Sequence, residues 1–128
     1  MAETTVLSVG GSIVAPDGVD TAYVRAFCEA IRVRLQADRF ARFALVIGGG
    51  FAARSYQAAL REIDPSVPTA TQDLVGIAAT RLNAALVSAL LRDYASGAII
   101  TDPTAPPDPS ARVLVSGGWK PGFSTDNV

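Results

Sequence analysis

Three clusters of glycine, each preceded by a short apolar run, are the residues of this chain best suited to chemistry. They are Gly10-Gly11, Gly48-Gly49-Gly50 and Gly117-Gly118. Glycine lacks the Cβ atom that would keep a ligand away from the backbone, and it tolerates positive φ. Where a helix follows, its free N–H groups and its dipole favour anions, especially phosphate. One cluster is weak evidence because tight turns also use glycine, whereas three together predict that backbone amides surround a polyanion.

Two charged side chains could complete such a site. Arg54 follows the second cluster by about one helical turn, so its guanidinium can point back toward the loop and hold a phosphate bidentately. The alternative is a solvated helix arginine, like Arg61. Asp73, near the start of the next helical stretch, could accept hydrogen bonds from a ribose diol. Alternatively, its carboxylate could simply stabilise the helix by lying in the first turn, at the positive end of the helix dipole.

The helical stretch 69–94 carries a face of small and polar residues. These are Asp73, Gly76, Thr80, and Asn83 or Ala84, which follow helical spacing. A small, polar face on an otherwise apolar helix predicts a close partner, either a ligand or another subunit.

The terminal segment 118–125 is rich in groups that bind anions. Lys120 is the only lysine of the chain, and Ser124 and Thr125 offer hydroxyls beside backbone N–H groups. Such a loop could wrap a phosphate or contact a base through its backbone. A glycine-rich hairpin end would have the same composition.

Composition excludes several classes of function. Eleven basic and 12 acidic residues give a net charge of −1, and no basic stripe is present that would suit a nucleic acid. Histidine is absent, which removes the usual general base and the commonest metal ligand, so no metal-ligating residues are assigned. Cys28 stands alone and is expected to pack as a small hydrophobe. The longest uncharged run, 4–16, is too short to span a membrane, and a cytoplasmic protein is expected.

The elements that must position these residues alternate between strands and helices. Apolar runs predict strands at 5–11, 43–50, 96–101 and 112–118. Apolar residues at helical spacing predict helices at 19–38, 51–63 and 69–94, and Asp20 or Thr21 is the expected N-cap of the first. Four prolines predict a surface loop at 102–111. This order predicts one α/β domain with a parallel sheet covered on both faces. All three glycine clusters then lie at the carboxyl ends of strands, where such sheets bind ligands.

Four stretches in this order resemble the uridylate kinase branch of the amino-acid kinase superfamily, closest to its archaeal type. They are LSVGGSIV, VIGGGFAARSY, DLVGIAATRLNAALV and VLVSGGWKPGFSTD, and together they extend over the whole chain. The resemblance implies a three-layer α/β/α sandwich with a mainly parallel sheet. It also implies ATP-dependent phosphorylation of UMP to UDP with Mg²⁺, a step of pyrimidine biosynthesis. Such enzymes act by positioning and charge stabilisation, so the lack of histidine is no obstacle.

The resemblance also implies roles for individual residues. Gly10 and Gly11 would face the transferring phosphates, while Gly50 and the catalytic Arg54 would meet the phosphate region; all four are expected to take part in cofactor binding. Gly49 would contact UMP, and Asp73 would bind its ribose. The UMP site would be completed by Gly118, Trp119, Lys120, Pro121, Gly122, Phe123, Ser124 and Thr125, with Thr125 reaching the α-phosphate.

The resemblance extends over about half of a family member. The chain 1–128 is therefore expected to be a single domain that corresponds to the UMP-binding N-terminal half, without the ATP-binding C-terminal half, and to be a fragment that is inactive or aggregation-prone alone. Bacterial relatives place a lysine where this chain has Ser8. Two alternatives stay open: a non-catalytic protein that binds nucleotides or stores oxyanions such as molybdate, and an assembly piece. The resemblance implies a homo-oligomer, since members of the family form hexamers built from dimers.

Overall fold

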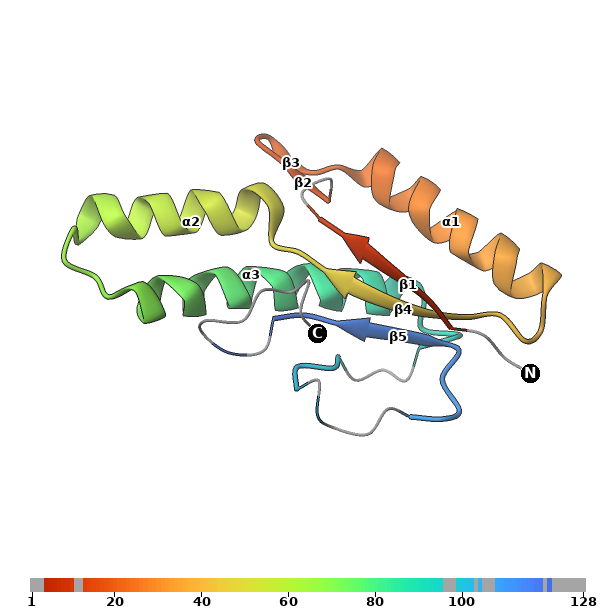
Figure 1. Cartoon of the computed structure of the whole chain (residues 1–128). Helices are drawn as coiled ribbons and strands as arrows, with labels where there is room; N and C mark the ends of the chain where they lie inside the picture. The colour runs from red at the N-terminus through yellow and green to blue at the C-terminus, as the bar shows by residue number, and fades with distance from the viewer. Residues whose placement is uncertain are drawn as a thin grey trace.

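A parallel sheet forms the centre of the molecule (Figure 1). The computed structural model describes residues 4–10, 13–95, 99–102, 104, 108–118 and 120. The sheet has the order β1-β4-β5, with strands β1 (Thr4–Val9), β4 (Arg42–Ile47) and β5 (Val113–Ser116). In register, Leu7 pairs with Leu45 and Leu45 with Val115. The predicted mainly parallel α/β fold is confirmed, and the sheet is open.

At the third predicted strand, 96–101, the described residues show isolated pairing beside β5. Parallel bridges join Ala95 to Val113 and Ile100 to Ser116. Residues 96–98 lie outside the described part of the chain. The described residues of the predicted surface loop are mostly exposed, and in it Asp102 and Asp108 accept hydrogen bonds from Thr104 and Ser110, which lower the pKa of both carboxyls.

Helix α1 (Thr21–Ala37) begins where a side chain caps it. Asp20 accepts a hydrogen bond from the Tyr23 amide at 3.0 Å, as an N-cap residue does. The buried stripe of α1 is Val24, Cys28, Ile31 and Leu35. Cys28 packs as the predicted small hydrophobe, and its burial raises the pKa of the thiol, although Arg32 nearby opposes the shift.

A short hairpin precedes α1 that the sequence analysis did not predict. Strands β2 (Val14–Ala15) and β3 (Gly18–Val19) pair antiparallel, and Gly18 adopts a φ of 127° in the turn. Val19, the first residue of the predicted helical stretch, therefore belongs to β3, where it pairs with Val14, and the helix begins after Asp20, one of the two predicted N-cap residues. The Asp20 amide then donates to the Ile13 carbonyl at 2.8 Å, which closes the hairpin at the base of the helix.

Helices α2 (Gly50–Ile63) and α3 (Thr69–Leu90) pack against each other (Figure 1). The contact is close because a Cβ on Gly76 would lie 2.6 Å from Gln57 Nε2, and Gln57 donates to the Gln72 carbonyl at 2.9 Å. Helix α3 begins at Thr69 and has no acidic residue in its first turn. The expectation that Asp73 lies in the first turn is therefore wrong, since Pro68 is the N-cap and the helix begins earlier.

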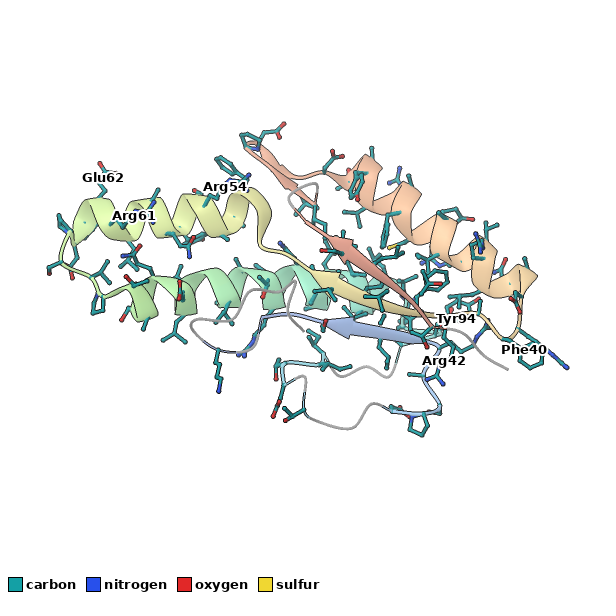
Figure 2. The ribbon with its side chains drawn as sticks, in the orientation of Figure 1. Phe40, Arg42, Arg54, Arg61, Glu62 and Tyr94 are labelled. Atoms are coloured by element: carbon teal, nitrogen blue, oxygen red, sulfur yellow. The ribbon has the colours of Figure 1, made fainter. Side chains whose placement is uncertain are left out.

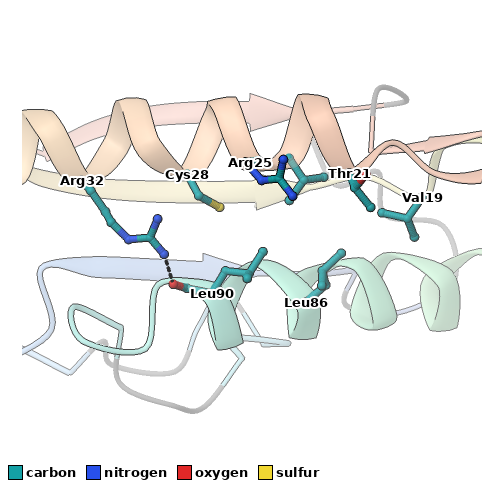
Figure 3. A pocket seen from close by; sticks show the side chains of 8 residues that line it. Val19, Thr21, Arg25, Cys28, Arg32, Leu86 and Leu90 are labelled. Atoms are coloured by element: carbon teal, nitrogen blue, oxygen red, sulfur yellow. Dashed lines mark hydrogen bonds between the residues drawn. The ribbon is translucent and has the colours of Figure 1, made fainter.

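The core lies between one face of the sheet and helices α1 and α3. Phe43, Leu45, Ile47, Val113 and Val115 share this face and form one buried cluster with residues of both helices. Figure 3 shows α1 and α3 side by side in front of the sheet, with a hollow of about 270 Å³ between them. Helices were expected on both faces of the sheet, and the described helices that pack against the sheet, α1 and α3, cover the core face. On the other face Val6 is 66% exposed.

Candidate functional site

The ends of β1 and β4 bring the first two glycine clusters together. The Gly48 amide donates to the Val9 carbonyl at 2.8 Å. A Cβ on Gly48 would lie 3.2 Å from the Cα of Gly10, a tight contact, so glycine favours this close approach of the two strand ends. All three strand arrows point toward the same edge of the sheet (Figure 1). The predicted common edge is confirmed for the glycines that the structure describes.

The second cluster forms an open helix N-terminus. Gly49 lies in the right-handed region, with φ −85° and ψ −26°, and Gly50 has a positive φ of 59°. Successive residues of right- and left-handed conformation turn their N–H groups toward one point and form an anion-binding nest. Helix α2 has no side-chain cap, and no described residue accepts a hydrogen bond from the amides of Gly49 or Gly50. These amides and the helix dipole therefore suit a phosphate.

The third cluster is held by helix α3. The Gly118 amide donates to Thr80 Oγ1 at 2.6 Å, and Arg81 Nε donates to the Gly118 carbonyl at 3.1 Å. A Cβ on Gly118 would lie 3.0 Å from both Ile77 and Thr80 side chains. Glycine is needed here because the strand end packs directly on the helix. The backbone groups of Gly118 are engaged by α3, which fixes the point where segment 118–125 begins.

The same helix also holds the second cluster. Asn83 Nδ2 donates to the carbonyls of Gly48 and Gly49 at 2.9 and 3.1 Å. The Asn83 side chain is buried, with 3% of the residue exposed. The small, polar face of α3 was expected to meet a ligand or another subunit. It instead packs on α2 through Gly76 and on two glycine loops through Thr80 and Asn83.

The predicted charged residues lie on the two helices at this edge. Figure 2 places the exposed Arg54 toward the N-terminal end of α2, and no described residue pairs with its guanidinium. Asp73 is half-buried and engaged in an interaction, one helical turn before Gly76. A Cβ on Gly49 would lie 3.5 Å from the Gly76 carbonyl, so α3 passes close to the nest here. Lys120 is exposed and, like Asp73, takes part in an interaction.

Several predicted site residues lie outside the described residues. They are Gly11, Trp119, Pro121, Gly122, Phe123, Ser124 and Thr125. Among the residues that are described, no group of three His, Cys, Asp or Glu side chains could hold a metal ion.

The contact of Arg81 with Gly118, and the hydrogen bonds of Thr80 and Asn83 to the glycine loops, were not predicted from the sequence. Their signal in the sequence is polarity within an apolar helix, since buried polar side chains need hydrogen-bond partners. Thr80, Asn83 and Ser88 are the polar residues buried in the described chain. That pattern predicts an internal partner but not its identity.

Comparison with known proteins gives a consistent result. Residues 3–116 match the model of the amino acid kinase family. Uridylate kinase of Thermoplasma acidophilum is 35% identical over 100% of this chain and 54% of its own length, and that of Halorubrum lacusprofundi is 41% identical over 96% and 50%. The crystal structure of uridylate kinase from Archaeoglobus fulgidus matches 94% of this chain and 53% of its own, with a TM-score of 0.77 and 33% identity. The chain thus spans about half the length of these relatives.

Proposed function

The chain belongs to the amino acid kinase family, and from this premise we propose that it supplies the UMP- and phosphate-binding part of a uridylate kinase. In the proposed reaction an oxygen of the UMP phosphate attacks the terminal phosphorus of ATP. The bond from that phosphorus to the bridging oxygen breaks, so UDP and ADP are the products. The relatives that carry the name uridylate kinase support this proposal.

The observation that carries the proposal is the open nest at the start of α2. The amides of Gly49 and Gly50 have no described acceptor, and Arg54 follows one turn later with a guanidinium that no described residue pairs. Phosphoryl transfer needs little from a protein beyond positioned donors and positive charge around the phosphates. The nest and Arg54 offer both at one helix end.

Gly10 adds support because no local reason requires glycine there. Its φ is not positive, and a Cβ on it would meet nothing within 4 Å. Glycine at such a position leaves space beside the backbone for a ligand. We assign Gly10 and Gly11 to the transferring phosphates, and Asp73 with segment 118–125 to UMP.

The fit of Mg²⁺ differs from the fit of the phosphates. When bound, the ion would neutralise charge on the phosphate oxygens of the nucleotides. The described residues offer no cluster of carboxylates that would hold it. We therefore assign no step of the reaction to Mg²⁺ through this chain's described residues.

The proposal is tested with UMP and uridine. In calorimetry the chain should bind UMP at least about 10-fold more tightly than uridine, because charge-assisted hydrogen bonds to the phosphate are lost with uridine. With ATP and Mg²⁺ the uridylate kinase that contains this chain should form UDP. Equal affinity for UMP and uridine, or binding of molybdate in place of UMP, would contradict the proposal. No observation on the described residues favours the oxyanion-storage alternative.

We also propose that copies of the chain associate through the outer face of α2 and α3. Tyr56, Leu74 and Leu82 are exposed there, and Leu82 is 70% exposed. Leu82 borders a hollow of about 240 Å³ that is lined by Ala52, Tyr56, Val75, Ala78, Ala79 and Leu82. A projecting leucine beside an apolar hollow suits a twofold interface, in which the same surface meets itself.

Leu82→Lys should shift the chain from oligomer to monomer. The lysine would place a charge in the apolar contact, where it loses its hydration. Sedimentation velocity measures the change. The matched control is Val33→Lys, which adds the same charge at an exposed apolar residue on α1. A wild-type chain that sediments only as a monomer would rule out this interface.

A cytoplasmic location completes the proposal. Helix α3 is long and apolar enough to cross a membrane, with a mean hydropathy of 1.3. It packs in the core, however, where Ala84 and Val87 are fully buried. The central helices of soluble proteins have the same composition, so the apolar character of α3 is explained by the fold.

A further inference from the structure

Asn83 is a buried side chain of α3 that contacts the loop of the proposed phosphate site through the loop's carbonyls. Its Nδ2 donates to two consecutive carbonyls, of Gly48 at 2.9 Å and of Gly49 at 3.1 Å. We propose that Asn83 is a positioning residue, which turns these carbonyls inward and thereby turns the amides of Gly49 and Gly50 outward toward the phosphate. The phosphate itself rests on the proposed function; the orientation of the loop does not.

The link between Asn83 and the amides is the planarity of the peptide group. In a trans peptide the C=O of one residue and the N–H of the next point in opposite directions. No cis peptide occurs in the described chain. The Gly48 carbonyl that points to Asn83 therefore requires the Gly49 amide to point away from α3, and the Gly49 carbonyl requires the same of the Gly50 amide.

The chemistry of the side chain suits this role. A single amide nitrogen carries two hydrogens, so one asparagine can serve two carbonyls at once. The Gly49 carbonyl also accepts the first helical hydrogen bond, from Ala53 at 3.3 Å, so Asn83 occupies its remaining lone pair. An aspartate of the same shape would place a carboxylate against two carbonyl oxygens and could donate only when protonated.

Thr80 anchors the third glycine cluster to the same helix, α3. It lies one turn before Asn83 on α3, and its hydroxyl oxygen accepts the Gly118 amide at 2.6 Å while the hydroxyl donates to the Ile77 carbonyl at 2.7 Å. One helix therefore sets both the nest and the start of segment 118–125. A shift of either loop must be taken up by α3, which holds the two in a fixed relation.

The test compares Asn83→Leu and Asn83→Asp with the wild-type chain. Ser88→Ala is the matched control, because Ser88 is also polar and buried on α3 and none of the hydrogen bonds to the described glycines comes from it. Sulfate is the first probe, since it stays a dianion over the whole pH range. The carbonyl ¹³C shifts of Gly48 and Gly49 report their hydrogen bonds without any ligand.

Both substitutions should weaken sulfate binding by about 10-fold at neutral or higher pH, since the amides lose their orientation toward the charge. The carbonyl shifts of Gly48 and Gly49 should move in both variants and stay unchanged in Ser88→Ala. For Asn83→Asp the deficit should shrink as pH falls, because a protonated carboxyl can again donate one hydrogen bond. The free energy of unfolding of Asn83→Asp is measured over the same pH range, and a deficit in sulfate binding that persists where the variant is fully folded distinguishes positioning from a purely structural role.

Wild-type sulfate affinity in a folded Asn83→Leu variant, or unmoved carbonyl shifts, would overturn the positioning role. If Asn83→Leu fails to fold, the pH profile of Asn83→Asp decides in its place. If the wild-type chain binds neither sulfate nor UMP, the proposed function fails. The carbonyl shifts then decide separately whether Asn83 orients the loop.

Discussion

Arg54→Ala should weaken UMP binding by roughly 10- to 100-fold while the free energy of unfolding changes by less than about 0.5 kcal/mol. The guanidinium is exposed and unpaired among the described residues, so its loss removes no contact that stabilises the fold. It follows the open N-terminus of α2 by one turn, where it adds positive charge to that of the helix dipole. Calorimetry with UMP and chemical denaturation measure the two effects on the same samples.

Arg61→Ala is the matched control for this experiment. Arg61 lies at the far end of α2, is also exposed, and donates to Gln72 at 3.1 Å (Figure 2). Its removal takes away the same charge from the same helix and should leave UMP affinity almost unchanged. Arg54→Lys should recover part of the loss, since a lysine keeps the charge but not the planar fork. An equal effect of Arg54→Ala and Arg61→Ala would mean that only net charge matters and that Arg54 has no specific role.

The elements of this fold were predictable where many residues repeat one pattern. Strands β1 and β4 lie in short apolar runs that end in glycines, and α1 has a stripe at helical spacing, so each prediction rests on several residues. The hairpin of β2 and β3 was not predicted, because each strand has only two residues and carries no period. Its remaining signal is the Asp17-Gly18 pair, in which glycine takes the positive φ that the turn requires.

The edge of the sheet at which the described glycines gather was predictable, whereas the contacts that hold them there were not. Glycines at strand ends predict an edge of the sheet because topology places parallel strand ends together. The contact between Asn83 and Gly48 joins residues 35 positions apart and depends on the angle at which α3 crosses the strand ends. That angle follows from the packing of Gly76 on Gln57 and of Gly118 on Ile77, which no local pattern contains.

Gly49→Ala and Gly10→Ala should separate the two reasons for glycine at this edge. A Cβ on Gly49 would collide with the Ala53 Cβ within the same helix end, so the start of α2 must move. We expect Gly49→Ala to lower the free energy of unfolding by about 1–3 kcal/mol, as overpacking does. Differential scanning calorimetry or chemical denaturation measures this loss.

Gly10→Ala should keep the stability of the fold and weaken nucleotide binding. Its Cβ would meet no atom of the described residues within 4 Å and its φ is not positive, so the free energy of unfolding should change by less than about 1 kcal/mol. If a nucleotide phosphate occupies the open space beside Gly10, the new methyl group must displace it, and nucleotide affinity should fall while the fold is kept. Unchanged affinity in a stable Gly10→Ala variant would place the phosphates elsewhere and leave the first glycine cluster without a part in the site. The two substitutions add the same methyl group on neighbouring strand ends. A loss of nucleotide affinity in Gly10→Ala and a loss of stability in Gly49→Ala would therefore show that glycine leaves room for a ligand at the first position and for protein packing at the second.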